Sequence, residues 1–333
     1  MNDRILGRTG LGVSGIAFGC GPTAALMIQG TPEQRREAVG RALTLGINYF
    51  DTAPGYGDAA SEANLGRTLQ ELGARPHIAT KVALEIDDMD DIAGAVVRSV
   101  EASLSRLRVP EVAVIQLHNR VGLQRAAKPE FGSGALLSEG DILGRGGVVE
   151  GFRRVRERGL ARFFGCSAFG GDMSCVRNLI DSDAFDSIMV HYSLHNPSAF
   201  TSVGPNGARD YQQVGARAAA RGMGVIALRV LEGGALIGAG AVAPKGMPEA
   251  EFKDIAALAG GIQARFGAEL APAETALRFA LSNAAVSTTI VGMSNVAQVQ
   301  DAAAWSKNGP LPENILAGIE ALRTAPAVAA AAN

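Results

Sequence analysis

The sequence predicts an α/β protein whose strands and helices alternate and close into a (β/α)8 TIM barrel. Eight short apolar runs rich in strand-forming residues alternate with longer segments whose apolar residues recur at helical spacing. The length of 333 residues suits one elaborated barrel, and no Pro/Ser-rich linker divides the chain. We therefore expect a single domain over residues 1–333, with a frayed tail at 325–333.

Each predicted strand is a short apolar run, and a helical pattern follows it. The first helix is expected to begin with a capping box, in which Thr31 precedes Pro32 and Gln34 reaches back. Glycines are expected to end several helices, where the chain needs a left-handed residue. The predicted strands are Ile16–Cys20, Asn48–Asp51, His77–Ala83, Val112–His118, Arg162–Cys166, Asp186–Tyr192, Gly224–Leu228 and Val286–Val291, and the helix-ending glycines are Gly46, Gly73, Gly159 and Gly222.

Three segments exceed the minimal repeat. Residues 1–15 are expected to form a short β-hairpin. Residues 119–147 and 229–249 are long Gly-rich loops after the fourth and seventh strands. In a barrel both loops lie on the C-terminal face, where binding sites are built.

A glycine motif near the N-terminus matches the dinucleotide fingerprint G-x-G-x-x-G at Gly10, Gly12 and Gly15. That fingerprint requires a strand before it and a helix after it, so that helix amides can hold a pyrophosphate. Here the strand-like run Ile16–Cys20 follows the motif. We therefore interpret it as a hairpin turn and give a Rossmann fold little weight.

Composition excludes several classes of partner. Lys and Arg number 31 and Asp and Glu 33, and a formal charge of −2 argues against nucleic acid or an anionic membrane. The uncharged stretches 9–32 and 279–300 are interrupted by glycines or polar side chains, so neither is expected to span a membrane. Three cysteines without metal-ligand spacing predict free thiols, a cytoplasmic location and no metal site.

Four polar residues stand at the ends of consecutive predicted strands. Asp51 ends the second strand, Tyr56 lies in the loop after it, Lys81 lies near the end of the third, and His118 ends the fourth. In a closed barrel these ends meet at one mouth. An ammonium favours a phenolate, a carboxylate holds the ammonium, and a histidine can orient a carbonyl. Each residue alone is commonly structural, but together they predict a catalytic site.

These residues lie in motifs that resemble the aldo-keto reductase family. The resemblance runs from about Leu6 to Trp305. It rests on Gly46–Ala53 (GINYFDTA), Tyr56-Gly57, Ser61-Glu62 with Leu65-Gly66, Thr80-Lys81 and Leu117-His118, and less strongly on Phe164–Ser167, Tyr192–Leu194 and Gly292–Gln298. The resemblance implies a (β/α)8 barrel that binds NADP or NAD without a Rossmann domain.

The resemblance also implies a role for each of the four residues. Tyr56 would be the general acid for carbonyl reduction, or the base for alcohol oxidation. Lys81 would lower the pKa of Tyr56, Asp51 would pair with Lys81, and His118 would orient the substrate. The protein would supply positioning and electrostatics, while hydride passes directly between the cofactor and the carbon atom.

The cofactor half departs from the family pattern. The family usually holds the carboxamide with a Ser-Asn pair and a glutamine, whereas Ser167 is followed by Ala168, and Met189 stands at the glutamine position. Leu228 stands where an aromatic often stacks, and no Lys or Arg lies within 292–298 to meet a 2′-phosphate. The expected cofactor contacts are Ser167, Met189, Arg229, Leu231, Gly292, Ser294 and Gln298; the expected substrate contacts are Met27, Asn119 and His191.

Three functions remain open at this point. The first is an NAD(P)H-dependent reductase of aldehydes and ketones, and the second is an NAD(P)+-dependent sugar or alcohol dehydrogenase that uses the same four residues. The third is a regulatory barrel that binds the cofactor with little turnover, motivated by Ala168, Met189 and Leu228. The family resemblance favours NADPH slightly, although the segment 292–298 lacks the usual positive charge.

Overall fold

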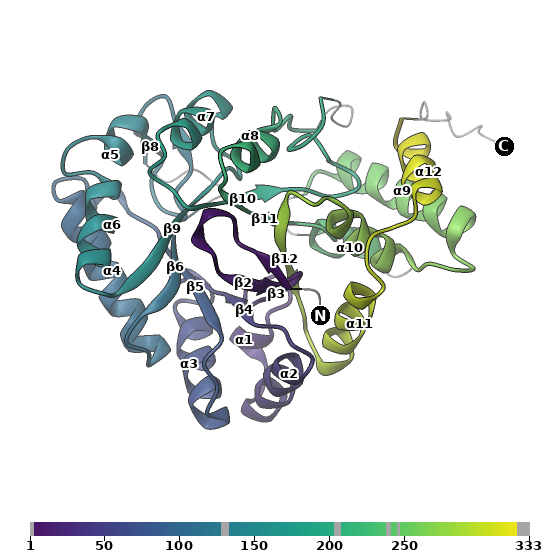
Figure 1. The fold of residues 1–333 in the computed structure, drawn as a ribbon, viewed down its shortest axis with the longest axis horizontal. Coiled ribbons are helices and arrows are strands. Elements are labelled where there is room, and N and C mark those ends of the chain that lie inside the picture. Colours follow the sequence, from purple (N-terminus) through teal and green to yellow (C-terminus); the bar gives the residue numbers. More distant parts are fainter. Residues whose placement is uncertain (1–2, 128–132, 203–207, 238–240, 245–246, 325–333) are drawn as a thin grey trace.

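The computed structural model describes residues 3–127, 133–202, 208–237, 241–244 and 247–324. Eight parallel strands close into one barrel, as predicted, and helices surround it (Figure 1). The strands, in order around the barrel, are β3 (Ile16–Gly19), β4 (Tyr49–Asp51), β5 (His77–Val82), β6 (Val112–Leu117), β9 (Ala161–Ser167), β10 (Ser187–His191), β11 (Gly224–Leu228) and β12 (Val286–Gly292). Each observed strand overlaps its predicted range. The predicted fraying of 325–333 falls outside the described residues.

A helix follows every barrel strand, which confirms the repeated unit. These helices are α2 (Pro32–Thr44), α3 (Ala60–Leu72), α4 (Ile92–Leu107), α6 (Val148–Glu157), α7 (Met173–Asp181), α8 (Val214–Ala220), α10 (Pro272–Ser282) and α11 (Val296–Lys307). The capping box of α2 is present, because Thr31 Oγ1 accepts from Gln34 N and Gln34 Oε1 accepts from Thr31 N. The predicted helix-ending glycines all have positive φ: Gly46 (88°), Gly73 (61°), Gly159 (69°) and Gly222 (74°).

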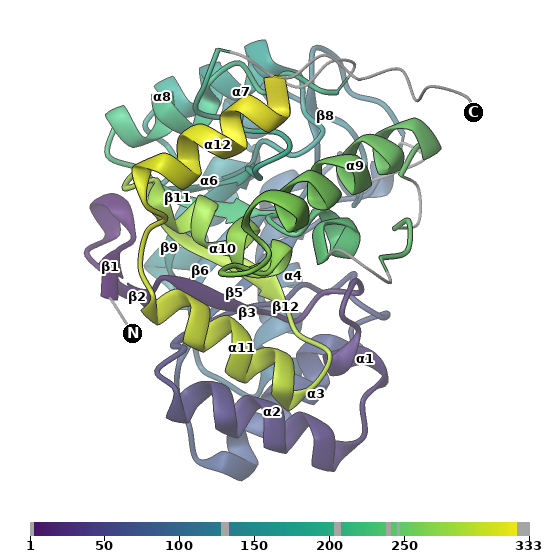
Figure 2. The same ribbon diagram turned by 90° about the vertical axis from the view of Figure 1, so that its right-hand side faces the viewer.

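The N-terminal hairpin closes one end of the barrel. Strands β1 (Asp3–Ile5) and β2 (Gly12–Ser14) pair antiparallel, and the short helix η1 (Gly7–Thr9) connects them. Leu6, Leu11 and Val13 pack against side chains of the barrel interior. Figure 2 shows the hairpin on the side of the molecule away from α1 (Leu26–Gln29), the short helix that follows β3. The glycine motif therefore belongs to the hairpin, as expected: Gly10 ends the connection, Gly12 begins β2, and Gly15 lies between β2 and β3.

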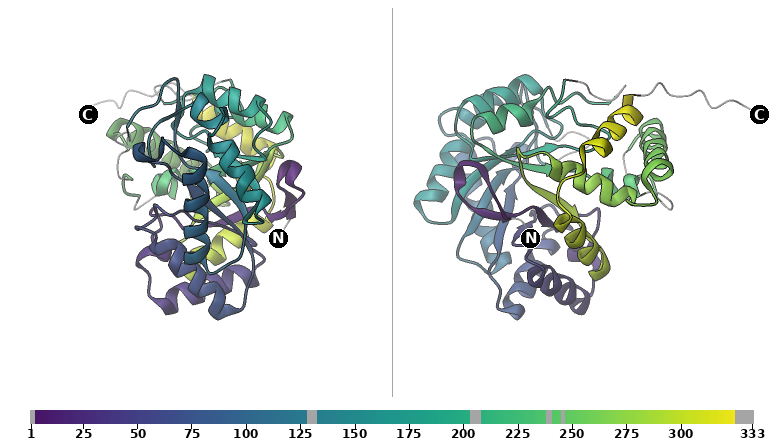
Figure 3. Two further views of the ribbon diagram at one scale, coloured as in Figure 1. Left: turned by 90° about the vertical axis from the view of Figure 1, so that its left-hand side faces the viewer. Right: turned by 45° about the vertical axis from the view of Figure 1, so that its right-hand side comes forward.

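The long connections carry extra structure. Residues 119–147 include the paired strands β7 (Val121–Gly122) and β8 (Leu137–Ser138) and the helix α5 (Glu139–Leu143). The chain after β11 forms η3 (Glu232–Ile237) and then α9 (Glu249–Phe266). Helix α9 packs against α12 (Glu313–Thr324) around a second apolar cluster beside the barrel (Figure 3, right). The remaining short helix, η2 (Ile86–Asp88), follows β5.

Strand alternation decides which side chains face the barrel interior. Tyr49, Ala79 and Val114 belong to the interior apolar cluster. Residues two positions further along each strand share the same face, and they are Asp51, Lys81 and Gln116. The sequence thus places a polar layer directly above an apolar layer, at the C-terminal ends of three neighbouring strands.

Candidate active site

A buried ion pair lies inside the barrel mouth. Lys81 Nζ donates to Asp51 Oδ1 at 2.6 Å and to the Thr52 carbonyl at 2.7 Å. The two charged side chains are 1% and 3% exposed. Burial alone would lower the pKa of Lys81, but Asp51 and Tyr56 outweigh burial and raise it. Lys81 therefore carries a positive charge at neutral pH.

Tyr56 lies beside this ion pair, on the turn that follows β4. Lys81 Nζ is 4.8 Å from the centre of the Tyr56 ring. The ring of His118 meets the Tyr56 ring edge-on, with 5.8 Å between ring centres. The Tyr56 ring also packs over Gly21, where an added Cβ would lie 3.5 Å from the ring. The structure thus brings together all four residues that the sequence singled out.

Burial sets the protonation of Tyr56 and His118. Burial raises the pKa of Tyr56 above its ordinary value, and the nearby Lys81 charge opposes that shift. Burial also lowers the pKa of His118 to about 3, with repulsion from Lys81 adding to the effect. His118 is therefore a neutral imidazole at pH 7. Its Nδ1 atom is buried and has no hydrogen-bond partner among the described residues.

Gln116 is a member of this site that the sequence analysis missed. Its Nε2 donates to Asp51 Oδ2 at 3.1 Å, so Asp51 is held by Lys81 on one oxygen and by Gln116 on the other. Gln116 precedes His118 by two residues and is fully buried in β6. Side chains two residues apart on a strand lie on the same face, so a polar residue two positions before His118 was the signal that could have identified Gln116.

The residues expected at the nicotinamide carboxamide fit that group only in part. Ser167 Oγ, at the end of β9, accepts from Phe169 N at 3.2 Å, which leaves its O–H to donate. Ala168 and Met189 are buried, and neither side chain has a strong hydrogen-bonding group for the carboxamide. Met189 lies in the interior apolar cluster with Leu228 packed against it. Ser167 is thus the side chain of this group that can hydrogen-bond a carboxamide.

The remaining expected cofactor contacts lie on the loops after β11 and β12. Arg229 has a left-handed backbone (φ 63°), and its guanidinium lies 5.6 Å from the centre of the Phe169 ring. Arg229 forms no ion pair with the described residues, so it is available to a phosphate. Leu231 instead packs between the two apolar clusters.

The segment after β12 is open to a ligand. Gly292, Ser294 and Gln298 are exposed. Gln298 Oε1 accepts from Ser294 N at 2.7 Å, which holds this turn at the start of α11. An exposed polar turn of this kind fits the adenosine end of a dinucleotide, although it carries no positive side chain.

Two residues expected to contact substrate are buried and engaged by other parts of the protein. Asn119 is fully buried, donates to the carbonyls of Leu84 and Ala135, and accepts from Leu84 N. Its amide therefore connects the loop after β6 to the chain after β5 and has no hydrogen left to donate. Met27 is 1% exposed and belongs to the main core. The physical reason in both cases is burial, which the position in the sequence does not reveal.

The third expected substrate contact, His191, belongs to a second buried polar cluster. His191 Nε2 lies 2.8 Å from Glu232 Oε1, and because a carboxylate only accepts, the imidazole donates. Ser193 Oγ donates to the same oxygen, and Tyr211 Oη lies 3.4 Å from His191 Nδ1. Glu232, which is 1% exposed, thereby ties η3 to the end of β10. No local pattern around Glu232 predicts this contact.

Replacing Glu232 with glutamine is expected to lower the free energy of unfolding at pH 7 by about 1–3 kcal/mol, since buried hydrogen bonds to a charged group are lost. Burial alone would raise the pKa of Glu232, but His191 and Ser193 outweigh it, so the pKa is lowered. The stabilisation is therefore present above the unfolded pKa of about 4.3 and is lost as pH falls through the folded value. Urea unfolding of both proteins from pH 3 to pH 7 measures this; a difference that stays constant with pH contradicts it.

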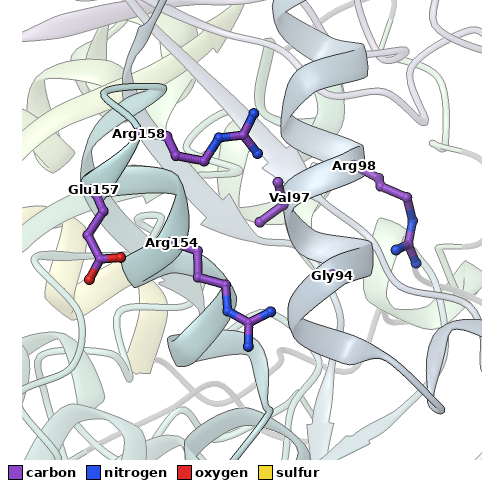
Figure 4. A pocket seen from close by; sticks show the side chains of 6 residues that line it. All are labelled: Gly94, Val97, Arg98, Arg154, Glu157 and Arg158. Carbon is purple, nitrogen blue, oxygen red and sulfur yellow. The ribbon is translucent and has the colours of Figure 1, made fainter.

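A surface depression of about 440 Å³ lies far from these residues, between α4 and α6 on the outer ring (Figure 4). Its arginines are already paired, Arg154 with Glu150 and Arg158 with Glu101. The Arg-rich face of α6 is thus a solvated surface. Within the described part of the chain, no group of three His, Cys, Asp or Glu side chains could hold a metal ion. No helix there is both long and apolar enough to cross a membrane.

Comparisons with known proteins agree with this geometry. The model of the Aldo/keto reductase family matches residues 16–324. L-galactose dehydrogenase of Arabidopsis thaliana is 29% identical over 306 residues, which cover 90% of this chain and 86% of the relative. Pyridoxal 4-dehydrogenase of Microbacterium luteolum is 26% identical over 344 positions, which cover 91% and 92% of the two chains.

Solved structures show the same fold. An aldo-keto reductase from Bacillus halodurans, in its holo form, superposes with a TM-score of 0.75 and 21% identity, covering 97% of this chain and 96% of that chain. The apo form of the same protein superposes with a TM-score of 0.69. The family match spans all eight barrel strands. The chain therefore belongs to the aldo/keto reductase family and is an NAD(P)-dependent oxidoreductase.

Proposed function

We propose that this protein reduces aldehyde or ketone carbonyls of small molecules to alcohols, with Tyr56 as the general acid. The observation that carries the proposal is the position of Tyr56 at the barrel mouth, next to the Lys81 ammonium and to the ring of a neutral His118. Because burial raises the pKa of Tyr56, its hydroxyl keeps its proton at neutral pH. A protonated phenol is the form that an acid catalyst of reduction needs.

The reaction adds a hydride to the carbonyl carbon and a proton to its oxygen. A bound reduced nicotinamide supplies the hydride. Tyr56 gives its proton to the oxygen as negative charge develops there, and the Lys81 charge stabilises the resulting phenolate. The neutral imidazole of His118 donates a hydrogen bond to the carbonyl oxygen and orients it. Asp51, held by Gln116, keeps Lys81 charged and in place.

The dinucleotide is proposed to lie across the ends of β9, β11 and β12. Ser167 would donate to the carboxamide, Arg229 would meet the pyrophosphate, and the turn 292–298 would carry the adenosine. That turn has no Lys or Arg to bind a 2′-phosphate, so the proposal includes both NADP and NAD as cofactors. The three cysteines are buried free thiols, which supports the proposed cytoplasmic location.

The second candidate is the reverse reaction, an NAD(P)+-dependent sugar or alcohol dehydrogenase. The relatives named L-galactose dehydrogenase and pyridoxal 4-dehydrogenase favour it. In that direction Tyr56 must first lose its proton, so its raised pKa makes oxidation faster as pH rises. The regulatory barrel considered from the sequence ranks below both candidates, because the relatives that cover about nine-tenths of this chain are named as dehydrogenases.

A panel of cofactors and substrates tests the proposal. Purified protein is incubated with each of NADPH, NADH, NADP+ and NAD+, together with neutral and charged aldehydes or with sugars and alcohols, and the absorbance of reduced nicotinamide is followed. Reduction of aldehydes at pH 7 with multiple turnovers supports the reductase. Oxidation of sugars without aldehyde reduction replaces it with the second candidate, and no turnover with any pair overturns both.

A further inference from the structure

Two arginines outside the proposed catalytic residues reach the same turn at the barrel mouth with their side chains. This turn, Gly170-Gly171, follows β9, which pairs with β6. Arg120 follows His118 by two residues and lays its guanidinium against Gly170, where an added Cβ would come within 2.5 Å of Arg120 Nε. Arg209 belongs to the chain after β10 and donates to the Gly171 carbonyl.

Among the described residues, no carboxylate lies within ion-pair distance of Arg120 or Arg209. Arg154, Arg156 and Arg158 on the outer ring, by contrast, each pair with Asp or Glu. Arg120 Nε is buried and has no hydrogen-bond partner among the described residues. A buried donor without an acceptor costs free energy, so this group is suited to a ligand that accepts.

The two positive charges also act on each other. Burial lowers the pKa of Arg120, and the charge of Arg209 lowers it further. Tyr211 lies next to them, because the Arg209 guanidinium is 5.7 Å from the centre of its ring. The pKa of Tyr211 is raised to about 12, chiefly by burial, so its hydroxyl keeps its proton at neutral pH and adds no negative charge beside the arginines. An anion placed here would relieve the repulsion between the two guanidinium groups.

We propose that Arg120 and Arg209 form a subsite for an anionic group, a carboxylate or a phosphate, carried by the carbonyl substrate. The subsite rests on the proposed reductase function and narrows its substrate class. Because Arg120 lies two residues beyond His118 on the chain that leaves β6, we place this anion on the same molecule whose carbonyl His118 would orient. Guanidinium groups bind carboxylate and phosphate through paired, charge-assisted hydrogen bonds.

Kinetics with a matched pair of aldehydes tests this subsite. Wild type and Arg120→Met are compared on 4-carboxybenzaldehyde and 4-methylbenzaldehyde, which differ in charge more than in size. Loss of a charge-assisted pair is expected to raise KM for the carboxylated aldehyde about tenfold or more, with little change in KM for the neutral one. Arg209→Met is expected to act in the same direction, and Arg120→Lys to recover part of the loss.

Arg162→Met is the matched control, because Arg162 is exposed at the start of β9 and its loss changes the net charge equally. Thermal unfolding shows whether each variant is folded. Equal effects of Arg120→Met on both aldehydes, or an effect of Arg162→Met as large as that of Arg120→Met, overturn the subsite while leaving the reductase intact. A rise in the KM for NADPH with no effect on either aldehyde also overturns it, since the arginines would then bind the cofactor.

Calorimetry separates failure of the subsite from failure of the proposed function. The NADP+-loaded protein is titrated with benzoate and, as the neutral counterpart, with benzyl alcohol. Benzoate binding that Arg120→Met weakens, in a protein that turns over no aldehyde, supports the anion subsite and overturns the reductase. Benzoate binding that neither arginine variant changes overturns the subsite directly.

Discussion

Tyr56→Phe is expected to lower kcat for aldehyde reduction about 10²–10⁴-fold while leaving the fold intact, because general acid catalysis contributes on this scale. The phenyl ring keeps its packing over Gly21 and its edge contact with His118. The change removes the hydroxyl, and with it the proton that the reduced oxygen requires. Steady-state kinetics of the two proteins measure the expected loss of turnover, and thermal unfolding measures whether their stability is the same.

Tyr192→Phe is the matched control for this change. Tyr192 is buried against Phe200 and Phe279 on the outer side of the barrel, so its hydroxyl takes no part in the proposed chemistry. It is expected to keep wild-type turnover. Unchanged turnover in Tyr56→Phe would remove the general acid from the proposal, and an equal loss in both variants would point to folding instead.

Lys81→Met is expected to have the largest effect on stability, a loss of about 3–5 kcal/mol in the free energy of unfolding at pH 7, because it leaves a buried carboxylate without its counter-charge. Lys81 and Asp51 are 1% and 3% exposed, and Gln116 remains as a neutral partner of Asp51. Turnover should be lost as well. Urea unfolding provides the free energies.

The pH dependence gives this prediction a second test. Burial already raises the pKa of Asp51 in the wild type, where Lys81 opposes the shift. Without Lys81 the pKa of Asp51 rises further above its unfolded value of about 3.9, so the folded variant holds a proton over a wider pH range than the wild type. A group whose pKa is higher in the folded state stabilises the fold at pH values below its unfolded pKa. That contribution is lost as the pH rises through its folded pKa. The difference in the free energy of unfolding between wild type and Lys81→Met should therefore grow from pH 4 to pH 7.

Two further variants isolate the ion pair. Lys253→Met removes an exposed lysine whose pair with Glu249 is 72% and 80% exposed, and it should change the free energy of unfolding by less than about 0.5 kcal/mol. The double variant Lys81→Met with Asp51→Leu replaces the pair by apolar groups and should recover much of the stability without any activity. A double variant no more stable than Lys81→Met would show that the loss comes from packing.

The barrel could be predicted because its signals are local. Every barrel strand is a short segment rich in apolar residues, and helices carry their own periodicity, cap or final glycine, as the Thr31–Gln34 capping box and Gly159 illustrate. Once eight such units close, the strand ends must converge, so Asp51, Lys81 and His118 could be grouped without coordinates. The family match then agrees with what the spacing of these residues had indicated.

The tertiary structure decided which side chains at the mouth are free to act. Asn119 and Met27 stand at promising positions in the sequence, yet burial engages the first with backbone and the second with the core. Other groups at the mouth come together through contacts between segments that are far apart in the sequence. Glu232 contacts His191 across 41 residues, and the side chains of Arg120 and Arg209 meet at the glycine turn after β9. The sequence alone was enough to predict the barrel and to propose its catalytic residues, because strand and helix signals are local. Only the folded chain decided the partners of the loop residues, because those partners depend on how far-apart segments pack.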